Sequence, residues 1–300
     1  MTEVKVPDAG GATMNMVDVG GFIQPIFQKS GKEIKNIFNN VPKYKFLDDD
    51  LMLCTFAKTG TNWMFEILMM ILNRSANRVE ANKMYTMLES VTAEEADQQP
   101  PPRVVNSHYP PRYLPLEGMR AKQIKTVLCI RNPKDIAVSY YNHAKGVKTY
   151  DYDGKWEDWL QVYLQGKLEY GKYCEYLLEW QREVKNGPGF PLHVMFYEDL
   201  KMNGREELDK LLKFLDIQLD EQLKNDIIDK CGFKKMSEEK GSDKIFDIYC
   251  KPGFNFFRKG QVGDWKNWFT VAQNEMFDKI WEKETKGQDM FKFKYTYTDA

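Results

Sequence analysis

Lys58 and Gly60 stand at a turn between two apolar segments, in the stretch TFAKTGTNWMFEIL from Thr55 to Leu68. Backbone N–H groups at a helix start lack partners within the helix and attract anions, and Lys58 adds a positive charge beside them. A nucleoside-triphosphate loop places its lysine after the glycines, whereas Lys58 precedes Gly60. The spacing predicts an anion site of another kind. From this turn alone, an ordinary strand-to-helix connection is an equal alternative.

Two further stretches join cations to turn residues. In RNPKDIAVSYY, Arg131 to Tyr141, a cation follows an apolar run, Asn132 can cap a helix and Pro133 suits the first helical position. In FRKGQVGDWKNWFT, Phe257 to Thr270, two cations precede a glycine that lets the backbone approach a ligand closely. A buried strand that ends in a cation at a helix start therefore occurs twice.

These candidate residues need a frame that brings them together. LMLCTF at 51–56 and IKTVLCI at 124–130 are short apolar runs, typical of strands buried on both faces of a parallel sheet. Strands alternating with helices predict an α/β fold, a single domain with a mainly parallel central sheet flanked by helices. We expect a flexible arm over 1–20 and the domain over 21–300. The patterns also predict a strand at 191–200 and helices at 62–72, 156–182, 206–215 and 220–230.

Composition limits the class of protein. Of 300 residues 42% are hydrophobic, and 43 basic residues nearly cancel 44 acidic ones, which argues against nucleic acid or an anionic membrane as the main partner. The five cysteines are dispersed without a C-x-x-C pair, which argues against a disulfide framework or a zinc site and favours a reducing compartment. No secretory signal or membrane-spanning run is apparent, so we expect a cytoplasmic protein.

Taken together, the three motifs resemble those of the cytosolic sulfotransferases. The family patterns are Y-P-K-[ST]-G-T-T-W, R-N-P-K-D followed by V-S-Y-Y, and R-K-G-x-x-G-D-W-K-N-x-F-T, and the resemblance extends over residues 35–292. It implies a P-loop-kinase-like sulfotransferase fold. It also implies in-line transfer of a sulfuryl group, without a metal, from 3′-phosphoadenosine 5′-phosphosulfate (PAPS) to a small acceptor such as a phenol, alcohol, sterol or amine. The second product would be 3′-phosphoadenosine 5′-phosphate (PAP).

The resemblance also assigns binding residues. Lys58 would neutralise charge on the oxygen that links phosphate to the departing sulfuryl group. Arginine presents a fork of donors that matches phosphate oxygens. The 5′-phosphosulfate is assigned to Lys58, Thr59, Gly60, Thr61, Asn62 and Trp63, the 3′-phosphate to Arg131, Ser139, Arg258, Lys259 and Gly260, and the adenosine to Trp63, Tyr197, Cys231, Phe233 and Met236.

His108, in NSHYP, matches the family's K-T-H-x-P and is the candidate general base, because histidine titrates near neutral pH. Asn106 stands where the family has lysine, so one cation near the transferring group is missing. Ala57 and Asn62 replace a proline and a threonine of the first loop. Cys231 replaces a threonine, and a thiol is the weaker hydrogen-bond partner.

Lys266 to Glu275 matches the family's K-x-x-x-T-V-x-x-x-E segment, which predicts a homodimer. The acceptor does not follow from the motifs, although His143 hints at a polar pocket. Sequence leaves open whether sulfation leads on to dehydration. The alternatives are a PAPS-binding or PAP-binding relative whose catalysis is altered, which Asn106 keeps open, and a nucleotide kinase of related fold.

Overall fold

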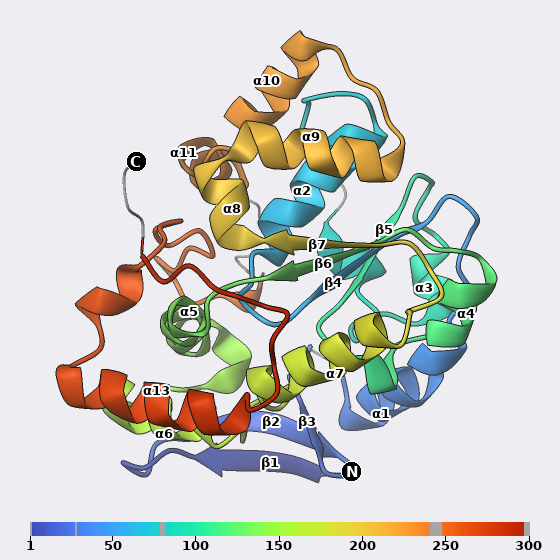
Figure 1. The fold of residues 1–300 in the computed structure, drawn as a ribbon. Helices are drawn as coiled ribbons and strands as arrows, with labels where there is room; N and C mark the ends of the chain where they lie inside the picture. Colours follow the sequence, from blue (N-terminus) through green and yellow to red (C-terminus); the bar gives the residue numbers. More distant parts are fainter. Residues whose placement is uncertain (1, 28, 79–81, 241–247, 297–300) are drawn as a thin grey trace.

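The central sheet has four parallel strands in the order β5-β4-β6-β7 (Figure 1). The structure, a computed structural model, describes residues 2–27, 29–78, 82–240 and 248–296. The sheet confirms the prediction of an α/β fold with a mainly parallel sheet. Its strands are β4 (Leu51–Thr55), β5 (Val104–Ser107), β6 (Thr126–Ile130) and β7 (Leu192–Phe196).

Both faces of this sheet are buried, which explains the continuous apolar runs in the sequence. Successive side chains of a strand point to opposite faces. Thus Leu51 and Leu53 contribute to one hydrophobic core, while Met52 and Cys54 contribute to the other.

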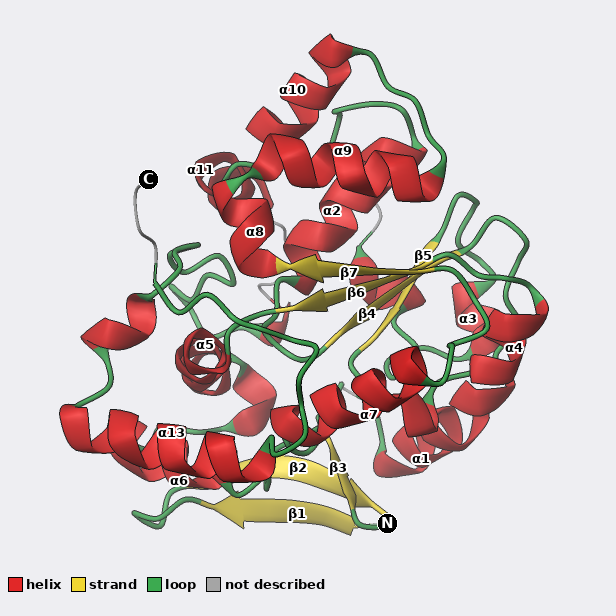
Figure 2. Cartoon of the chain, in the orientation of Figure 1, coloured by secondary structure: helices red, strands yellow, loops and turns green. Residues whose placement is uncertain are grey.

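Helices cover the sheet in two layers (Figures 1 and 2). One core packs under α2, α9 and α10, and the larger core packs against α5, α6 and α7. The predicted helices at 62–72, 206–215 and 220–230 are confirmed as α2, α9 and α10. The helices are α1 (Gly31–Asn40), α2 (Thr61–Leu72), α3 (Ala93–Ala96), α4 (Leu116–Ala121), α5 (Pro133–Gly146), α6 (Trp156–Leu164), α7 (Tyr173–Lys185), α8 (Tyr197–Met202), α9 (Gly204–Leu215), α10 (Glu221–Lys230), α11 (Phe233–Lys235) and α13 (Val271–Glu284).

The N-terminal segment is ordered, so the expectation of a flexible arm over 1–20 is wrong. Strands β1 (Thr2–Pro7), β2 (Thr13–Val19) and β3 (Phe22–Gln24) form an antiparallel sheet. Met14 and Met16 are fully buried on alternate positions of β2, and Asp8 accepts a hydrogen bond from the Tyr152 hydroxyl at 2.7 Å. Burial of these side chains against the larger core orders the segment.

Two other boundaries differ from prediction. The strand predicted over 191–200 ends at Phe196, because Tyr197 begins α8, whose first turn holds two carboxylates that favour a helix start. The helical pattern at 156–182 is broken between α6 and α7. Gly166, Tyr170 and Gly171 adopt positive φ there, which a helix does not allow.

The strand order fixes where a site can form. The chain runs from β4 to β5 on one side and then crosses to β6 on the other, so the strand order reverses between β4 and β6, and a crevice opens there at the carboxyl ends of the strands. Every predicted motif of the N-terminal half directly follows one of these strands.

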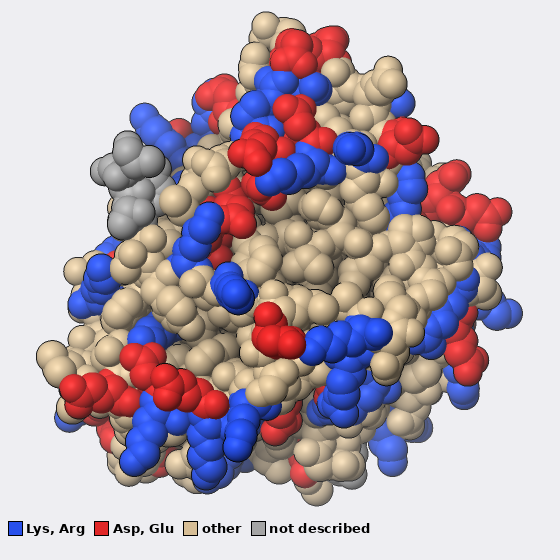
Figure 3. Space-filling view, viewed as in Figure 1, with Lys and Arg blue, Asp and Glu red and all other residues tan. Residues whose placement is uncertain are grey.

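Acidic and basic side chains are mixed around the rim of the face drawn in Figure 3. Across the ranges that the structure covers, none of the helices combines the length and the apolar character needed to cross a membrane.

Candidate functional site

A pocket lies at the carboxyl ends of the central strands, and the predicted site residues line it. Of the residues assigned to binding or catalysis from the motifs, only Thr59 is not part of the lining. The Thr59 side chain turns inward and donates to the Phe56 carbonyl at 2.9 Å, so it shapes the loop. The lining includes Lys58, Gly60, Thr61, Asn62, Trp63, His108, Arg131, Ser139, Tyr197, Cys231, Phe233, Met236, Arg258, Lys259 and Gly260.

The loop after β4 turns sharply into α2. Lys58 has φ 71° and Gly60 has φ 106°. A Cβ at Gly60 would lie 2.8 Å from the Tyr197 ring, so only glycine fits both the backbone and the space. Among the described residues, no side chain caps the start of α2, and its first N–H groups therefore remain available for an anion in the pocket.

Lys58 is a destabilised cation in this loop. Its Nζ lies 5.2 Å from the centre of the Phe256 ring. Burial, together with the positive charges of Lys83, Arg131 and Arg258, lowers the pKa of Lys58 to about 7. A bound anion would oppose both effects and stabilise the charged form.

Arg131 follows β6 and faces the loop of Lys58. One guanidinium nitrogen donates to the Lys58 carbonyl at 3.2 Å, and the guanidinium lies 4.2 Å from the centre of the Tyr197 ring. Its Nε is buried and has no hydrogen-bond partner among the described residues. Arg131 is therefore held in place with donor capacity left over.

The C-terminal basic turn is fastened to the start of α5. Asp135 accepts from the backbone N–H groups of Gly263 and Trp265 at 2.8 and 3.0 Å. Asn132 caps α5 as predicted, since its side chain accepts from the Asp135 N–H at 2.8 Å. The second and third motifs therefore form one structural unit.

Asp264 orients the two cations of that turn. It accepts from Arg258 at 2.5 Å and from Lys259 at 2.7 Å. Burial alone would raise the pKa of Asp264, but hydrogen bonds from Lys259, Asn267 and Arg258 outweigh it and lower that pKa to about 2. Asp264 thus stays ionised at neutral pH.

An aromatic compartment lies next to the start of α2. Trp63 and Tyr197 pack edge to face with ring centres 5.2 Å apart, and Trp63 Nε1 donates to the Cys231 carbonyl at 2.8 Å. The Cys231 thiol contacts Met70 in the core, 3.6 Å from its sulfur, so this residue meets the compartment mainly through its backbone. Gly260 also closes the compartment, because a Cβ there would lie 2.1 Å from the Phe233 ring.

His108, directly after β5, is a neutral base. Its Nδ1 lies 2.8 Å from the Thr55 hydroxyl and 3.1 Å from the Thr55 carbonyl, and its backbone N–H donates to Glu89 at 2.7 Å. Burial holds the pKa of His108 well below its ordinary value, and the positive charges of Lys83 and Lys58 act in the same direction. The Thr55 hydroxyl is in turn 2.9 Å from the Thr61 hydroxyl, which links the base to α2.

Lys83, Glu169 and Tyr150 are among the polar pocket residues that sequence reasoning missed. Glu169 is 1% exposed; its Oε1 accepts from the Tyr150 hydroxyl and its Oε2 has no hydrogen-bond partner in the described ranges. Burial raises the pKa of Glu169. None of the three lies in a recognised motif, so the sequence carried no local signal for them.

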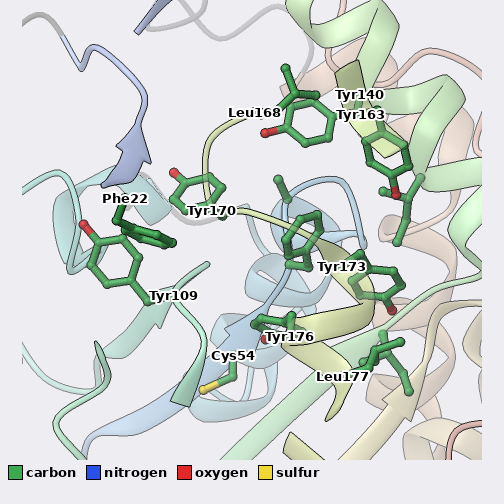
Figure 4. Packing of buried hydrophobic residues seen from close by; sticks show 14 of the residues in the cluster. Phe22, Cys54, Tyr109, Tyr140, Tyr163, Leu168, Tyr170, Tyr173, Tyr176 and Leu177 are labelled. Atoms are coloured by element: carbon green, nitrogen blue, oxygen red, sulfur yellow. The ribbon is translucent and has the colours of Figure 1, made fainter. Parts of the chain in front are cut away.

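Phe22 and Tyr109 belong to the hydrophobic core and are absent from the pocket lining. Figure 4 shows Phe22 and Tyr109 packed together, and their ring centres are 5.8 Å apart. Tyr109 is 1% exposed and donates to Gln24 at 2.7 Å.

Comparisons with known proteins agree with the motifs. A family model described as a sulfotransferase domain matches residues 48–289. Mouse sulfotransferase 1A1 is 35% identical over 257 residues, which span 80% of this chain and 86% of that protein.

Solved structures share the fold. Mouse sulfotransferase SULT7A1 complexed with PAP has a TM-score of 0.74 at 24% identity, with 90% of this chain and 94% of the other covered. Retinol dehydratase in a complex with retinol and PAP has a TM-score of 0.73 at 19% identity, with 97% and 92% covered.

Proposed function

This chain belongs to the sulfotransferase domain family, and on that premise we propose that it moves a sulfuryl group from PAPS to a hydroxyl or amine of a small organic acceptor. His108 is the general base in this proposal. The observation that carries it is the joint position of a neutral His108 and a destabilised Lys58 on one pocket at the strand ends.

The pocket chemistry fits the donor. Buried donors without a partner favour an anionic ligand, and the Arg131 Nε is such a donor. We assign the 3′-phosphate to Arg131, Ser139, Arg258 and Lys259. The start of α2 and Lys58 would hold the 5′-phosphosulfate, and the compartment of Trp63, Tyr197, Phe233 and Met236 would hold the adenosine.

Each reacting group has a defined task. PAPS, when bound, supplies the sulfuryl group. The Nε2 lone pair of His108 accepts the proton of the acceptor hydroxyl as that oxygen bonds to sulfur. Lys58 stabilises negative charge on the oxygen whose bond to sulfur breaks. No other covalent step is needed, and the expectation that no metal takes part stays a prediction.

We assign the acceptor to the part of the pocket that Glu169 and His143 line, which contains polar atoms as well as aromatic rings. The Oε2 of Glu169 and the Nδ1 of His143 are buried and lack hydrogen-bond partners in the described chain. A buried carboxylate oxygen such as the Oε2 of Glu169 favours a ligand that donates to it. We therefore infer an acceptor that carries a second donor group, such as a protonated amine, besides the reacting hydroxyl.

Two further proposals concern the state of the protein. We propose a homodimer through Lys266 to Glu275, because Val271 in this segment is 77% exposed. We also propose a reducing, cytoplasmic setting, which the free, buried thiols of Cys54, Cys129, Cys174 and Cys231 support.

The direct test is transfer of labelled sulfate from PAPS to a panel of phenols, sterols, alcohols and amines, with the products identified by mass spectrometry. A sulfated product supports the proposal, and a dehydrated product would show that sulfation activates a leaving group. Binding of PAP without transfer to any acceptor would favour a relative with altered catalysis. Transfer of phosphate from ATP would favour a kinase, and absence of PAP binding would overturn the assignment.

A further inference from the structure

Asn106 positions the turn that carries Lys83. The Asn106 side-chain amide donates to the Lys83 carbonyl at 2.8 Å, and the N–H of Leu88 donates to the Asn106 carbonyl at 2.9 Å. Thr86, in the same turn (Lys83–Thr86), donates to the Val104 carbonyl at 2.7 Å. The turn is therefore fixed to β5, the strand that leads into His108.

Lys83 lines the pocket, and its ammonium has no strong acceptor among the described residues. Its Nζ is 3.3 Å from the Met87 sulfur and 3.9 Å from the Met84 sulfur, and thioethers accept hydrogen bonds weakly. Within the described ranges, no ion pair forms at Lys83. Burial lowers the pKa of Lys83 to about 8, although the charge of Glu89 opposes this. A buried cation of this kind favours an anionic ligand.

The positive charge of Lys83 acts on both Lys58 and His108. For both Lys58 and His108, Lys83 is the strongest of the charges that lower the pKa, second only to burial. Glu89, the acid whose charge acts on Lys83, already accepts the His108 backbone N–H through Oε1. Lys83, Lys58 and His108 therefore form one electrostatic cluster on the pocket wall.

We propose that Lys83 is a further catalytic residue, whose ammonium donates hydrogen bonds to the sulfuryl oxygens as the group passes from donor to acceptor. Lys83 keeps its protons throughout, while the acceptor proton goes to His108. This inference rests on the proposed function. It also explains the departure at Asn106: the lysine expected there is absent, and the asparagine side chain instead holds the turn that delivers a cation from another element.

The test compares two ligands that differ by the sulfuryl group. Calorimetry without an acceptor would measure PAPS and PAP affinities of wild type, Lys83→Met, Lys83→Arg and the surface control Lys122→Met, whose native lysine pairs with Asp48. Loss of a charge-assisted hydrogen bond predicts PAPS binding weaker by about 10- to 100-fold in Lys83→Met, with PAP affinity within about twofold. Lys83→Arg should retain most PAPS affinity, and Lys122→Met should match wild type.

A second readout does not depend on any ligand. Because the charge of Lys83 lowers the pKa of His108, Lys83→Met should raise that pKa, as measured by NMR titration of the imidazole, whereas Lys122→Met should not. If Lys83→Met is unstable, Lys83→Gln provides the same comparison.

Two results would overturn the inference. One is an unchanged ratio of PAPS to PAP affinity in Lys83→Met, whether both affinities stay the same or fall equally. The other is an effect limited to the KM of anionic acceptors, which would assign Lys83 to acceptor binding. Wild-type protein that binds neither PAPS nor PAP would instead overturn the proposed function, and this inference with it.

Discussion

The Nδ1 atom of His108 lies 3.1 Å from the main-chain oxygen of Thr55. A carbonyl oxygen only accepts hydrogen bonds, so a proton on Nδ1 satisfies this contact, and that tautomer leaves the lone pair on Nε2. Burial and the nearby lysine charges keep the pKa of His108 below its ordinary value, so the ring is neutral. Thr55 thus prepares His108 to accept a proton from a ligand in the pocket.

Replacing His108 by alanine should remove the base and leave the donor site intact. General-base catalysis contributes about 10²- to 10⁴-fold, so we expect kcat to fall by roughly 10²-fold or more. PAP affinity, measured by calorimetry, should stay near wild type. His193→Ala is the matched control, because His193, on β7, packs against Phe214 and lies outside the pocket lining. A near-wild-type rate in His108→Ala would remove this residue from the mechanism.

The alkaline limb of the pH–rate profile should reflect the deprotonation of Lys58. The free enzyme must carry a protonated Lys58 to bind the phosphosulfate, and the pKa of this lysine is about 7. We therefore expect kcat/KM for PAPS to fall above about pH 7. The alkaline fall in kcat should occur at higher pH, because the bound anion stabilises the charged lysine.

The acid limb has the opposite sign and a different origin. His108 must be unprotonated to act as a base, and its pKa lies well below the ordinary value of 6.5. Activity should therefore be lost only at a pH well below 6.5. Lys58→Arg separates the two limbs, because arginine stays charged throughout this range. If its alkaline limb coincided with that of wild type, Lys58 would not be the group that titrates.

Sequence predicted the parts of the site that the backbone dictates. The turn at Gly60 and the cap at Asn132 need particular residue types, so their motifs can be recognised in the sequence. Lys83 and Glu169 come from segments without a periodic pattern, and only the three-dimensional structure brings them to the pocket.

The same contrast holds for the fold. The runs at 51–56 and 124–130 are buried on both faces, and their apolar character identified β4 and β6 directly. The first twenty residues were misassigned because β1 and β2 are polar on one face and are stabilised by contacts with distant segments, such as the hydrogen bond between Asp8 and Tyr152.

Loss of either arginine of the 3′-phosphate site should weaken donor binding. Each charge-assisted contact contributes about 1.5–3 kcal/mol, so Arg131→Ala or Arg258→Ala should reduce PAP affinity by about 10- to 100-fold in calorimetry. The effect on PAPS should be similar, which distinguishes these residues from Lys83. Arg120→Ala, which removes a surface pair with Glu183, is the control. Unchanged PAP affinity in Arg131→Ala would contradict the 3′-phosphate assignment.

A charge at the proposed dimer segment should separate the subunits. Val271 is 77% exposed at the first position of α13, next to the capping residue Thr270. Burying a carboxylate without a partner is unfavourable, so Val271→Glu should elute as a monomer in light-scattering chromatography if wild type is a dimer. Leu47→Glu, at another exposed apolar side chain, should leave the mass unchanged. A monomeric wild type would contradict the dimer proposal.

Acceptor preference should depend on Glu169. Its Oε2 is buried without a hydrogen-bond partner in the described chain, while Oε1 accepts from the Tyr150 hydroxyl. Glu169→Gln keeps the shape and removes the charge. An ammonium bonded to this carboxylate contributes about 1.5–3 kcal/mol, so kcat/KM for tyramine should fall by about 10-fold or more in the variant. The value for 4-ethylphenol, which has the same ring but no amine, should change by less than about twofold, because it lacks the donor. If kcat/KM fell equally for both phenols, Glu169 would stabilise the pocket without distinguishing between acceptors.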